Sequence, residues 1–565
     1  MSDSLLTNRE WGRMVIDGLR NLGISRFFMS PGARSSPLIA ALAECDDLSV
    51  TIHYDERGMS FAALGHAMAT GSPTVCITTS GSAVANLLPA CVEASHSGVP
   101  VIFVTADRPP ELRGTGANQT ILQPGIFGSF VRLVNDLPCP DDLTASKETL
   151  VAALSEAVAL STGSNPGPVH LNIPIREPLL ESDDAKTSGA IFPIKIPYAE
   201  ASRLPVSLDD FFASDSGVVV IGRLSSREQK GVTAIIDWAK RLGWPVFCDP
   251  LSGARLISGV VRHADWLLQR SDIPPPKRVL HFGGALVSKR IGKWLSACHG
   301  DDYIQVRDSP LPLDPWDQKP HVIRIDVLEF CSSIEPQPPS CNDWLSAWKA
   351  ADASVASVLQ DELGDKAELS EIEIARLAAR SALERGHKVF LANSMPVRDF
   401  DASAEALASK SSYVFGNRGA SGIDGNIATI AGIAMANDTP LLAIIGDLSA
   451  LHDLNSLPLL LNLRVTLVIV NNHGGGIFRF LPLPVTAVNR DKYWETPHHF
   501  GFAHAAAQFG IEYHSPTSIP ALKDLLSAPS ERARILECVT NRGDNERLHK
   551  AIADHVRKLD LKWPL

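Results

Sequence analysis

The feature that most constrains the fold is a regular alternation of short apolar runs with helix-like segments. The runs are nearly continuous and rich in β-branched residues, which is typical of strands covered by helices on both faces. They are Val75–Thr79, Val101–Thr105, Val218–Ile221, Val279–Phe282, Val389–Ala392, Leu441–Ile445 and Val465–Val470. Helix-like segments lie between them, for example Leu150–Leu160, Lys230–Leu242 and Ile372–Glu384. The alternation predicts an α/β fold built on parallel sheets.

The chain has 565 residues, more than one hydrophobic core supports, since domains average roughly 150 residues. Two stretches without clear periodicity, Ser182–Pro205 and Cys331–Asn342, contain several prolines and are expected to be linkers. Cutting the chain there predicts three doubly wound parallel-sheet domains, at residues 1–185, 200–335 and 365–565.

The composition fits a soluble globular protein, with 45% hydrophobic and 20% charged residues. A net charge of −11 argues against general nucleic-acid binding, which depends on basic faces. The N-terminal stretch Met1–Arg13 lacks the apolar core of a signal peptide. No stretch reaches the ~18 uncharged apolar residues that a membrane helix needs. We therefore expect a cytoplasmic protein without a membrane segment.

The cysteines give no sign of a disulfide framework or a zinc site. There are nine, an odd number, and no two of them form a CxxC pair. Scattered cysteines of this kind are typical of reduced, mostly buried thiols in a cytosolic protein.

Polar residues follow two successive apolar runs in the C-terminal block. Gly446-Asp447-Leu448-Ser449 follows the first run, and Asn471-Asn472-His473-Gly474-Gly475-Gly476 ends the second. Both strands of a parallel βαβ unit end at the same edge of the sheet, so Asp447 and Asn472 should converge there. Their hard oxygen ligands suit Mg²⁺ or Ca²⁺, and the glycines let the backbone approach a phosphate and supply a carbonyl as a third ligand.

Either half of this pattern also fits ordinary loop chemistry. Gly-Asp after a strand is a common turn or helix cap, and Asn-Asn and glycine runs are common in loops. Their matched placement at two strand ends, with 23 residues between Asp447 and Asn471, favours a metal site.

The Gly-Asp pair, a spacer of this size and the Asn-Asn pair resemble the signature of thiamine-diphosphate-dependent enzymes. Leu448 departs from the glycine that usually takes the third position, but both side-chain ligands remain. The resemblance implies thiamine diphosphate as cofactor, with Mg²⁺ or Mn²⁺ bridging it to the protein. The residues implied to bind the cofactor here are Asp447, Leu448, Ser449 and Asn472. It also implies the three-domain fold of this enzyme class.

Thiamine-diphosphate enzymes use a glutamate that hydrogen-bonds the aminopyrimidine ring, so that a ring nitrogen can remove the C2 proton. Glu56 is the candidate, because it lies between the expected short strand Leu48–Ile52 and the helix-like run Met59–Met68. Its position alone favours an ordinary acid at a helix N-terminus. Together with the metal motif, the resemblance favours the catalytic role, with Asp55 as the competing residue.

The resemblance also assigns the domains. The run Thr79–Asn86 resembles the family loop near the pyrimidine ring, which places Ser80 and Gly81 at the cofactor. Residues 1–185 would then bind the pyrimidine, 200–335 form a central domain, and 365–565 bind the diphosphate and metal. In this class the glutamate and the metal usually come from different chains. A homodimer or a dimer of dimers, with the active site at the chain interface, is expected.

Basic residues recur in five loops expected at strand ends. The loops are Pro31–Ser35, Ala106–Pro110, Ser288–Arg290, Asn393–Arg398 and Asn417–Gly422. A single arginine in such a loop is best interpreted as a solvated surface charge. Five basic loops at equivalent positions of an acidic protein favour a pocket for a multiply charged anion, since arginine pairs bidentately with carboxylates.

Several loops, in order along the chain, resemble the 2-succinyl-5-enolpyruvyl-6-hydroxy-3-cyclohexene-1-carboxylate synthases of menaquinone and phylloquinone biosynthesis. The resembling stretches are Ala106–Glu111, Gly116–Gln119, Ser394 with Arg398, Asn417–Gly425, Gly446–Leu454 and Asn471–Phe478. The resemblance implies decarboxylation of 2-oxoglutarate on thiamine diphosphate, followed by 1,4-addition of the resulting four-carbon carbanion to isochorismate.

The resemblance implies roles for individual residues. Those matching family positions that hold the two substrates are Arg34, Arg108, Gln119, Lys289, Arg290, Ser394, Arg398 and Arg418. Ser394 and Arg398 also join Glu56 as expected catalytic groups. Ile423 matches the apolar wedge that bends the cofactor, and Gly474 matches the backbone-carbonyl metal ligand. The residues that match the apolar wall of the family's site are Ile477, Phe478 and Leu481. Ala33 stands where the family often has serine and is left out of the site.

The sequence disfavours three other functions. An acetohydroxyacid-synthase-like or 2-oxoacid-decarboxylase-like enzyme would use pyruvate, which needs fewer cationic groups than the five loops supply. A non-catalytic relative with a decayed site is disfavoured because Glu56, Asp447 and Asn472 are present. A nucleotide-binding oxidoreductase would carry GxGxxG at a first βα turn, for which Gly283-Gly284 is a poor substitute.

Overall fold

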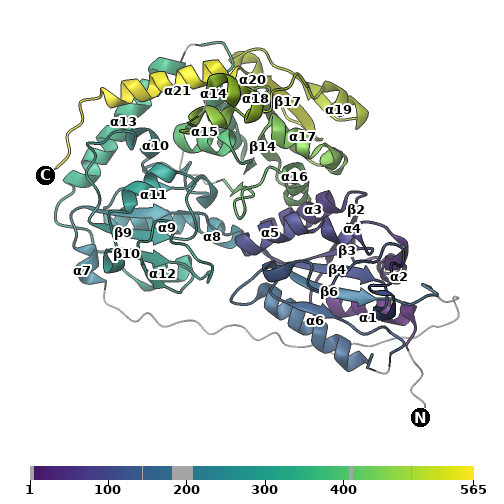
Figure 1. The fold of residues 1–565 in the computed structure, drawn as a ribbon. Coiled ribbons are helices and arrows are strands. Elements are labelled where there is room, and N and C mark those ends of the chain that lie inside the picture. Colours follow the sequence, from purple (N-terminus) through teal and green to yellow (C-terminus); the bar gives the residue numbers. More distant parts are fainter. Residues whose placement is uncertain are drawn as a thin grey trace. The chain divides into compact units, whose positions relative to one another are not determined.

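The computed structural model describes residues 6–142, 144–180, 208–364, 366–405, 412–484 and 486–564. These residues form three sheets, and all pairs of neighbouring strands are parallel (Figure 1). The α/β fold with three parallel sheets is therefore confirmed. The predicted linker Ser182–Pro205 lies outside the described residues.

The first sheet has the strand order β2-β1-β3-β4-β6-β5. Its strands are β1 (Arg26–Met29), β2 (Ser49–Ile52), β3 (Thr74–Thr78), β4 (Val101–Asp107), β5 (Val134–Asp136) and β6 (Val169–Pro174). Helices α1 (Asn8–Asn21), α2 (Ser36–Ala43) and α6 (Lys147–Thr162) pack against one face, and α3 (Glu56–Thr70) and α5 (Leu88–Ser97) against the other (Figure 1). Successive strand residues face opposite ways, so Phe27 joins the first core and Phe28 the second.

The second sheet has the order β11-β10-β9-β7-β8. Its strands are β7 (Gly217–Ile221), β8 (Val246–Cys248), β9 (Arg278–Phe282), β10 (Tyr303–Val306) and β11 (His321–Ile323). One face packs against α9 (Val232–Leu242) and α12 (Val327–Ser333). The other packs against α10 (Ala264–Leu267), α11 (Lys289–Leu295) and α13 (Asp343–Leu363).

The third sheet has the order β13-β12-β14-β15-β17-β16. Its strands are β12 (Lys388–Leu391), β13 (Val414–Phe415), β14 (Leu441–Gly446), β15 (Val465–Asn471), β16 (Glu512–His514) and β17 (Arg534–Val539). Helices α14 (Glu371–Arg385), α15 (Met395–Ser403) and α20 (Ile519–Ser527) share a core with one face. The other helices of this region are α16 (Asn426–Met435), α17 (Asp447–His452), α18 (Ala487–Tyr493), α19 (Ala503–Gln508) and α21 (Arg542–Arg557).

The elements expected from the sequence occur with small shifts. Every predicted strand overlaps an observed one to within two residues at each end. The segment Lys230–Leu242 is not one helix, because α8 (Ser226–Lys230) ends before Gly231 and α9 starts after it. The expected linker Cys331–Asn342 begins inside α12, since that helix continues to Ser333. The segment after α17 is a 3₁₀ helix, Leu454–Leu460, that contains Pro458, as the expected short helix and turn require.

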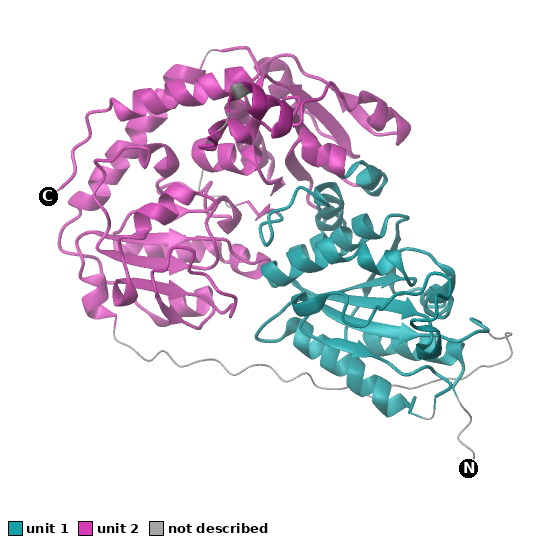
Figure 2. Ribbon diagram, viewed as in Figure 1, with its two compact units in different colours: residues 1–200, 417–437, 453–459 teal, residues 201–416, 438–452, 460–565 magenta. Residues whose placement is uncertain are grey.

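The chain forms two compact units (Figure 2). Unit 1 comprises residues 1–200, 417–437 and 453–459, and unit 2 comprises 201–416, 438–452 and 460–565. Within unit 1, α16 packs tightly on α3: a Cβ on Gly65 would overlap the carbonyl of Thr429, and a Cβ on Gly432 would overlap that of Ala62. Glycine is therefore required where the two backbones meet.

Near its middle, each sheet has a point where the chain leaves the strands on one side and begins to add strands on the other. These switch points lie between β1 and β3, between β7 and β9, and between β12 and β14. In open α/β sheets, ligands bind outside the carboxyl ends of the strands at such points. Predicted site residues occupy the loops there, namely Arg34 after β1, Ser80 and Gly81 after β3, Lys289 and Arg290 after β9, Ser394 after β12 and Asp447 after β14.

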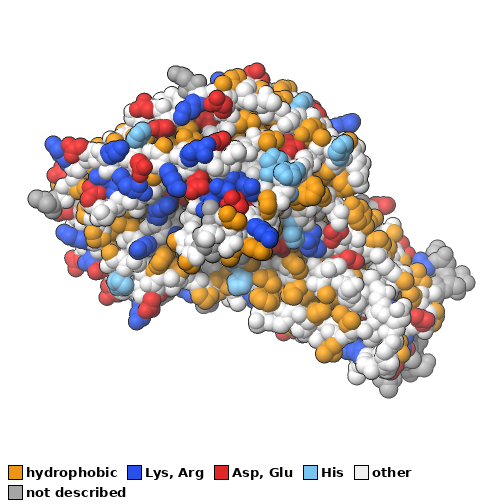
Figure 3. All heavy atoms as spheres, turned by 45° about the horizontal axis from the view of Figure 1, so that its top comes forward, with side chains coloured by type: hydrophobic (Ala, Val, Ile, Leu, Met, Phe, Trp, Pro, Cys, Tyr) orange, Lys and Arg blue, Asp and Glu red, His pale blue; other side chains and the backbone are white. Residues whose placement is uncertain are grey.

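Basic and acidic side chains lie intermixed over the face of unit 2 that Figure 3 presents. No helix in the described ranges is long and apolar enough to span a bilayer. All nine cysteines are free thiols, and six of them are buried.

Candidate active site

Asp447 is the first residue of α17 and is almost fully buried, with 3% of its surface exposed. Its Oδ1 accepts the backbone N–H of Leu448 at 2.7 Å, and its Oδ2 accepts that of Gly474 at 2.8 Å. Burial raises the pKa of this carboxyl, and the two backbone donors oppose the rise because they favour the charged form. The contacts bring together two of the three residues expected at the metal.

His498 is a further partner of Asp447. Its Nε2 lies 3.1 Å from Asp447 Oδ2, and its Nδ1 accepts the backbone N–H of Phe500 at 3.2 Å. Because Nδ1 is the acceptor, a neutral ring carries its proton on Nε2 and donates it to the carboxylate. His498 thus fixes the orientation of Asp447.

Asn472 follows β15 at the same edge, because β14 and β15 pair directly up to Gly446 and Val470. Its Nδ2 donates to Oε1 of Glu371 at 2.9 Å. Its Oδ1 is buried and has no hydrogen-bond partner among the described residues. A buried polar atom of this kind needs a partner, such as a water molecule, a ligand or an ion.

The loop after Asn472 passes so close to neighbouring residues that one of its positions, Gly474, has room only for glycine. Gly474 has φ +144°, and a Cβ there would overlap the carbonyl of Glu495 and Nη1 of Arg542. Arg542 Nη1 also donates to the carbonyl of His473 at 2.9 Å, which fixes the loop. In the described ranges no three side chains of His, Cys, Asp or Glu form a metal cluster. A carboxylate, an amide oxygen and a backbone carbonyl form a hard-oxygen set that fits Mg²⁺ or Mn²⁺.

Ser394 follows β12, the strand beside β14, and caps the start of α15. Its φ of +73° is rare for a residue other than glycine and costs conformational energy. Nη1 of Arg398, one helical turn later, donates to the Ser394 carbonyl. Strain of this kind gathers at functional sites. The roles of Ser394 and Arg398 stay predictions.

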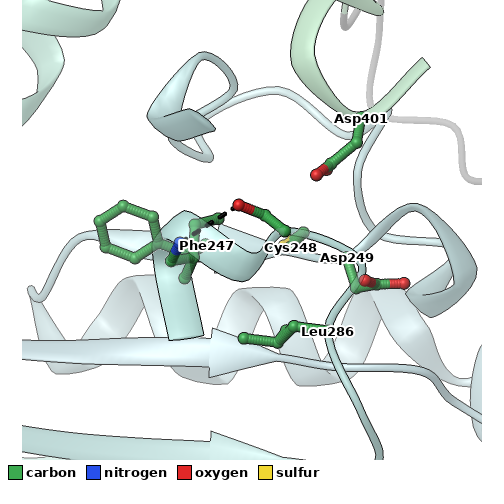
Figure 4. A pocket seen from close by; sticks show the side chains of 7 residues that line it. Phe247, Cys248, Asp249, Leu286 and Asp401 are labelled. Carbon is green, nitrogen blue, oxygen red and sulfur yellow. Dashed lines mark hydrogen bonds between the residues drawn. The ribbon is translucent and has the colours of Figure 1, made fainter. Parts of the chain in front are cut away.

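Lys289 and Arg290 are exposed at the start of α11, where Ser288 is the N-cap. Nη1 of Arg290 pairs with Oδ2 of Asp265 at 2.5 Å. Beside this turn lies a cavity of about 10 Å³, which is room for one water molecule. It is lined by Phe247, Cys248, Asp249, Leu286, Ser288, Ile291 and Asp401 (Figure 4). Asp401 reaches it from α15, so the second sheet's switch-point loop and the Ser394 helix adjoin.

The predicted apolar wall lies in the 3₁₀ helix Gly476–Phe480 and just after it. Ile477 and Phe478 are partly buried, and Leu481 is 41% exposed. An exposed apolar side chain next to the Asn472 loop is available to a ligand or to another protein surface.

In unit 1 four predicted residues meet at the end of β3. Nη1 of Arg108 donates to Oγ of Ser80 at 2.6 Å, and Nε2 of Gln119 donates to the Ser80 carbonyl at 3.0 Å. Gly81, with φ +82°, contacts Gln119 so closely that a Cβ would overlap its side chain. The Gly81 N–H donates to Oε1 of Gln123 at 2.8 Å, which fixes the loop.

The charge of Arg34 acts on Arg108. Arg34 is buried and donates to the carbonyl of Ile175 and to Oε1 of Glu177, both at 2.9 Å. Burial lowers the pKa of Arg108, and the charge of Arg34 lowers it further. Two neighbouring guanidinium groups favour an anion between them.

Asp55 and Glu56, the two candidate acids, differ in their contacts. Asp55 is the N-cap of α3, and its Oδ1 accepts the N–H groups of Arg57 at 3.0 Å and Gly58 at 3.3 Å. Glu56 is left partly exposed, and its Oε2 accepts Nδ2 of Asn86 at 3.2 Å. Because the Asp55 carboxylate caps the N-terminus of α3, Glu56 is the acid of the two that is more available to a ligand.

The loop carrying Arg418 and Ile423 is fixed by a buried carboxylate. Glu93 accepts the N–H groups of Gly419 and Ala420, each at 2.7 Å. Ile423 is 42% exposed, and its carbonyl accepts Nδ2 of Asn426 at 2.8 Å. The predicted wedge therefore projects from a rigid loop.

Comparisons with known proteins agree with this arrangement. Residues 9–126 match the family described as "Thiamine pyrophosphate enzyme, N-terminal TPP binding domain", and residues 200–391 match "Middle domain of thiamine pyrophosphate". The 2-succinyl-5-enolpyruvyl-6-hydroxy-3-cyclohexene-1-carboxylate synthase of Rubrobacter xylanophilus is 40% identical, covering 96% of this chain and 98% of the relative. The synthase of Salinibacter ruber is 36% identical over 97% of this chain and 96% of the relative.

The chain belongs to the 2-succinyl-5-enolpyruvyl-6-hydroxy-3-cyclohexene-1-carboxylate synthase family.

Membership in this synthase family makes the chain a thiamine-diphosphate-dependent enzyme. Several residues that hydrogen-bond predicted site residues or their loops escaped the sequence analysis, namely Glu93 and Gln123 in unit 1 and Glu371 and His498 in unit 2. They belong to no motif and contact the predicted residues from segments that are distant in the sequence. A buried acid or amide in an otherwise apolar helix, such as Glu93 in α5, is the only sequence feature that could have indicated one of them.

Proposed function

We propose that this protein decarboxylates 2-oxoglutarate and joins the remaining four-carbon unit to isochorismate by 1,4-addition. The product is 2-succinyl-5-enolpyruvyl-6-hydroxy-3-cyclohexene-1-carboxylate, on the route to menaquinone or phylloquinone. The observation that supports the proposal is that loops at the switch points of all three sheets carry the residues predicted to bind anions or the metal. We expect catalysis by Glu56, Ser394 and Arg398.

Asp447 and Asn472 would hold Mg²⁺ or Mn²⁺ through side-chain oxygens, with the carbonyl of Gly474 as a third ligand. The unpartnered Oδ1 of Asn472 and the glycine-only approach at Gly474 support this set. Ser80, Gly81, Leu448 and Ser449 would contact the cofactor. When bound, thiamine diphosphate supplies the nucleophile and the electron sink that decarboxylation of a 2-oxoacid needs.

Glu56 would hold the proton that its carboxyl shares with the aminopyrimidine ring. Ile423 would pack against the cofactor, and Ile477, Phe478 and Leu481 would keep water from the reacting carbon. An apolar surrounding favours loss of a carboxylate as CO₂, because it stabilises the charged reactant less than the dispersed charge that follows.

The distal carboxylate of 2-oxoglutarate and the carboxylates of isochorismate would bind to cationic groups. The candidates are Arg34, Arg108, Lys289, Arg290, Arg398 and Arg418, with Gln119 and Ser394 as neutral donors. Each hydrogen bond from a cation to a carboxylate is worth about 1.5–3 kcal/mol. Arg34 and Arg108 support this role most directly, since the charge of Arg34 lowers the pKa of Arg108.

We further propose a cytoplasmic homodimer or dimer of dimers that completes each active site at a chain interface. Ile52 and Tyr54, beside Glu56, are 64% and 61% exposed in the single chain. Large apolar side chains at such a position favour burial against another protein surface.

The test is an assay of the purified protein with thiamine diphosphate, Mg²⁺, 2-oxoglutarate and isochorismate, read by mass spectrometry of the product. The expected result is one molecule of CO₂ released for each molecule of adduct. Turnover of pyruvate without turnover of 2-oxoglutarate would contradict the assignment.

A further inference from the structure

We propose that Glu371 is a positioning residue that holds the Asn472 amide so that Oδ1 faces the divalent metal. This inference rests on the metal site of the proposed function and adds a residue to it. Glu371 comes from α14, 101 residues before Asn472 in the sequence.

One oxygen of Glu371 joins the ends of two adjacent strands. Its Oε1 accepts Nδ2 of Asn472 at 2.9 Å and Oγ1–H of Thr540 at 3.3 Å. Asn472 directly follows β15 and Thr540 directly follows β17, and these strands are neighbours in the sheet. The carboxylate therefore fixes Asn472 relative to the sheet rather than to a mobile loop.

The contact determines which end of the Asn472 amide faces the metal. A carboxylate oxygen accepts hydrogen bonds, so the amide NH₂ must face Glu371 and Oδ1 must point away from it. That oxygen is buried and has no hydrogen-bond partner in the described residues. A divalent cation is the partner that such an oxygen suits. Without Glu371, the amide could turn by 180° and present its NH₂ to the metal.

An acid in the first turn of a helix usually needs no explanation beyond the helix dipole. Glu371 differs because only 3% of its surface is exposed and its partners lie on other elements. Glu373, in the same turn, shows the ordinary case: it pairs with Arg376 at 2.8 Å within its own helix. The two acids are a matched pair for a test.

The experiment measures Mn²⁺ affinity in the presence of thiamine diphosphate, by electron paramagnetic resonance of the free ion. Glu371→Ala should bind Mn²⁺ about 10- to 100-fold more weakly than the unaltered protein, as is typical when a ligand's supporting hydrogen bond is removed. Glu371→Gln should keep most of the affinity, because its amide oxygen can accept the same bond. Glu373→Ala should leave the affinity unchanged.

Glu371→Asp keeps the charge but withdraws the carboxylate by one methylene, so it should resemble Glu371→Ala. It also serves as the decisive variant if Glu371→Ala fails to fold. Unchanged Mn²⁺ affinity in Glu371→Ala, or in Glu371→Asp if the alanine variant fails to fold, would overturn the positioning role while leaving the metal site intact. An equal loss in Glu373→Ala would overturn it as well. Failure of the unaltered protein to bind Mn²⁺, or unchanged binding after Asp447→Ala, would instead remove the metal site and the role with it.

Discussion

His498 donates from Nε2 to Oδ2 of Asp447 at 3.1 Å, although 51 residues separate the two in sequence. The N–H of Phe500 at Nδ1 fixes the tautomer that makes this donation possible. The carboxylate that begins α17 is therefore oriented by a side chain from a segment without regular secondary structure.

Replacing His498 with alanine should weaken binding of the divalent metal about 10-fold or more, because a ligand loses the donor that orients it. It should also lower the melting temperature, since a hydrogen bond to a buried charge contributes about 1.5–3 kcal/mol. His499→Ala is the control, because His499 is exposed. Equal metal affinities in the two variants would contradict the orienting role.

Glu56→Gln should lower kcat by about 100-fold or more, the range for loss of a positioned acid or base. Thiamine diphosphate should still bind, as measured by calorimetry, because the substitution leaves the metal ligands intact. The neighbouring acid should behave differently. Asp55→Ala should cost about 1 kcal/mol of stability through loss of the α3 cap, with kcat largely retained. A large fall in kcat confined to the Asp55 variant would reverse the assignment.

Stability should fall in acid through buried histidines, of which His281 is the clearest. Its Nε2 donates to the carbonyl of Gly284 at 2.9 Å, and its Nδ1 accepts from the hydroxyl of Tyr303 at 2.8 Å. Burial lowers its pKa to about 4. Because the folded pKa lies below the unfolded one, its contribution is present above about pH 6.5 and is lost as the pH falls toward 4.

Calorimetric melting between pH 7.5 and 4.5 measures this effect. The melting temperature of His281→Gln should fall less steeply with acid than that of the unaltered protein. His299→Gln, at an exposed histidine of the same sheet region, should keep the full slope. Identical slopes in all three proteins would exclude His281 as a source of acid sensitivity.

Gly432→Ala should destabilise unit 1, because the new methyl group overlaps the Ala62 carbonyl where α16 crosses α3. Overpacking of this kind costs about 1–3 kcal/mol. The loss should appear as a lower melting temperature and faster amide exchange in α3. Gly65→Ala should act in the same way from the other helix. Melting temperatures equal to that of the unaltered protein in both variants would show that the helices can move apart without loss of stability.

The sequence predicted the strands because burial on both faces leaves continuous β-branched runs that are easy to recognise. It also predicted that Asp447 and Asn472 lie at one sheet edge, since parallel strands end together. The break at Gly231 was missed because the apolar periodicity continues across it. The inclusion of Cys331–Ser333 in α12 was missed because the prolines that follow dominate that stretch.

The supporting residues could not be predicted in the same way. Glu371 looks like an ordinary acid at a helix start, and His498 lies in a loop without a motif. Both act through contacts over long sequence separations, which no local pattern encodes. Ser394 is similar, because its positive φ is imposed by the surrounding fold and leaves no trace in its residue type. The domain boundaries and the individual site residues stay predictions.

A crystal structure with thiamine diphosphate and Mg²⁺ tests the account most directly. We predict a cation bound by an Asp447 carboxylate oxygen, Oδ1 of Asn472 and the Gly474 carbonyl, at about 2.0–2.1 Å. Glu56 of one chain should contact the aminopyrimidine ring held by the metal site of another. A diphosphate bound elsewhere, or a metal that leaves Oδ1 of Asn472 without a partner, would contradict the account.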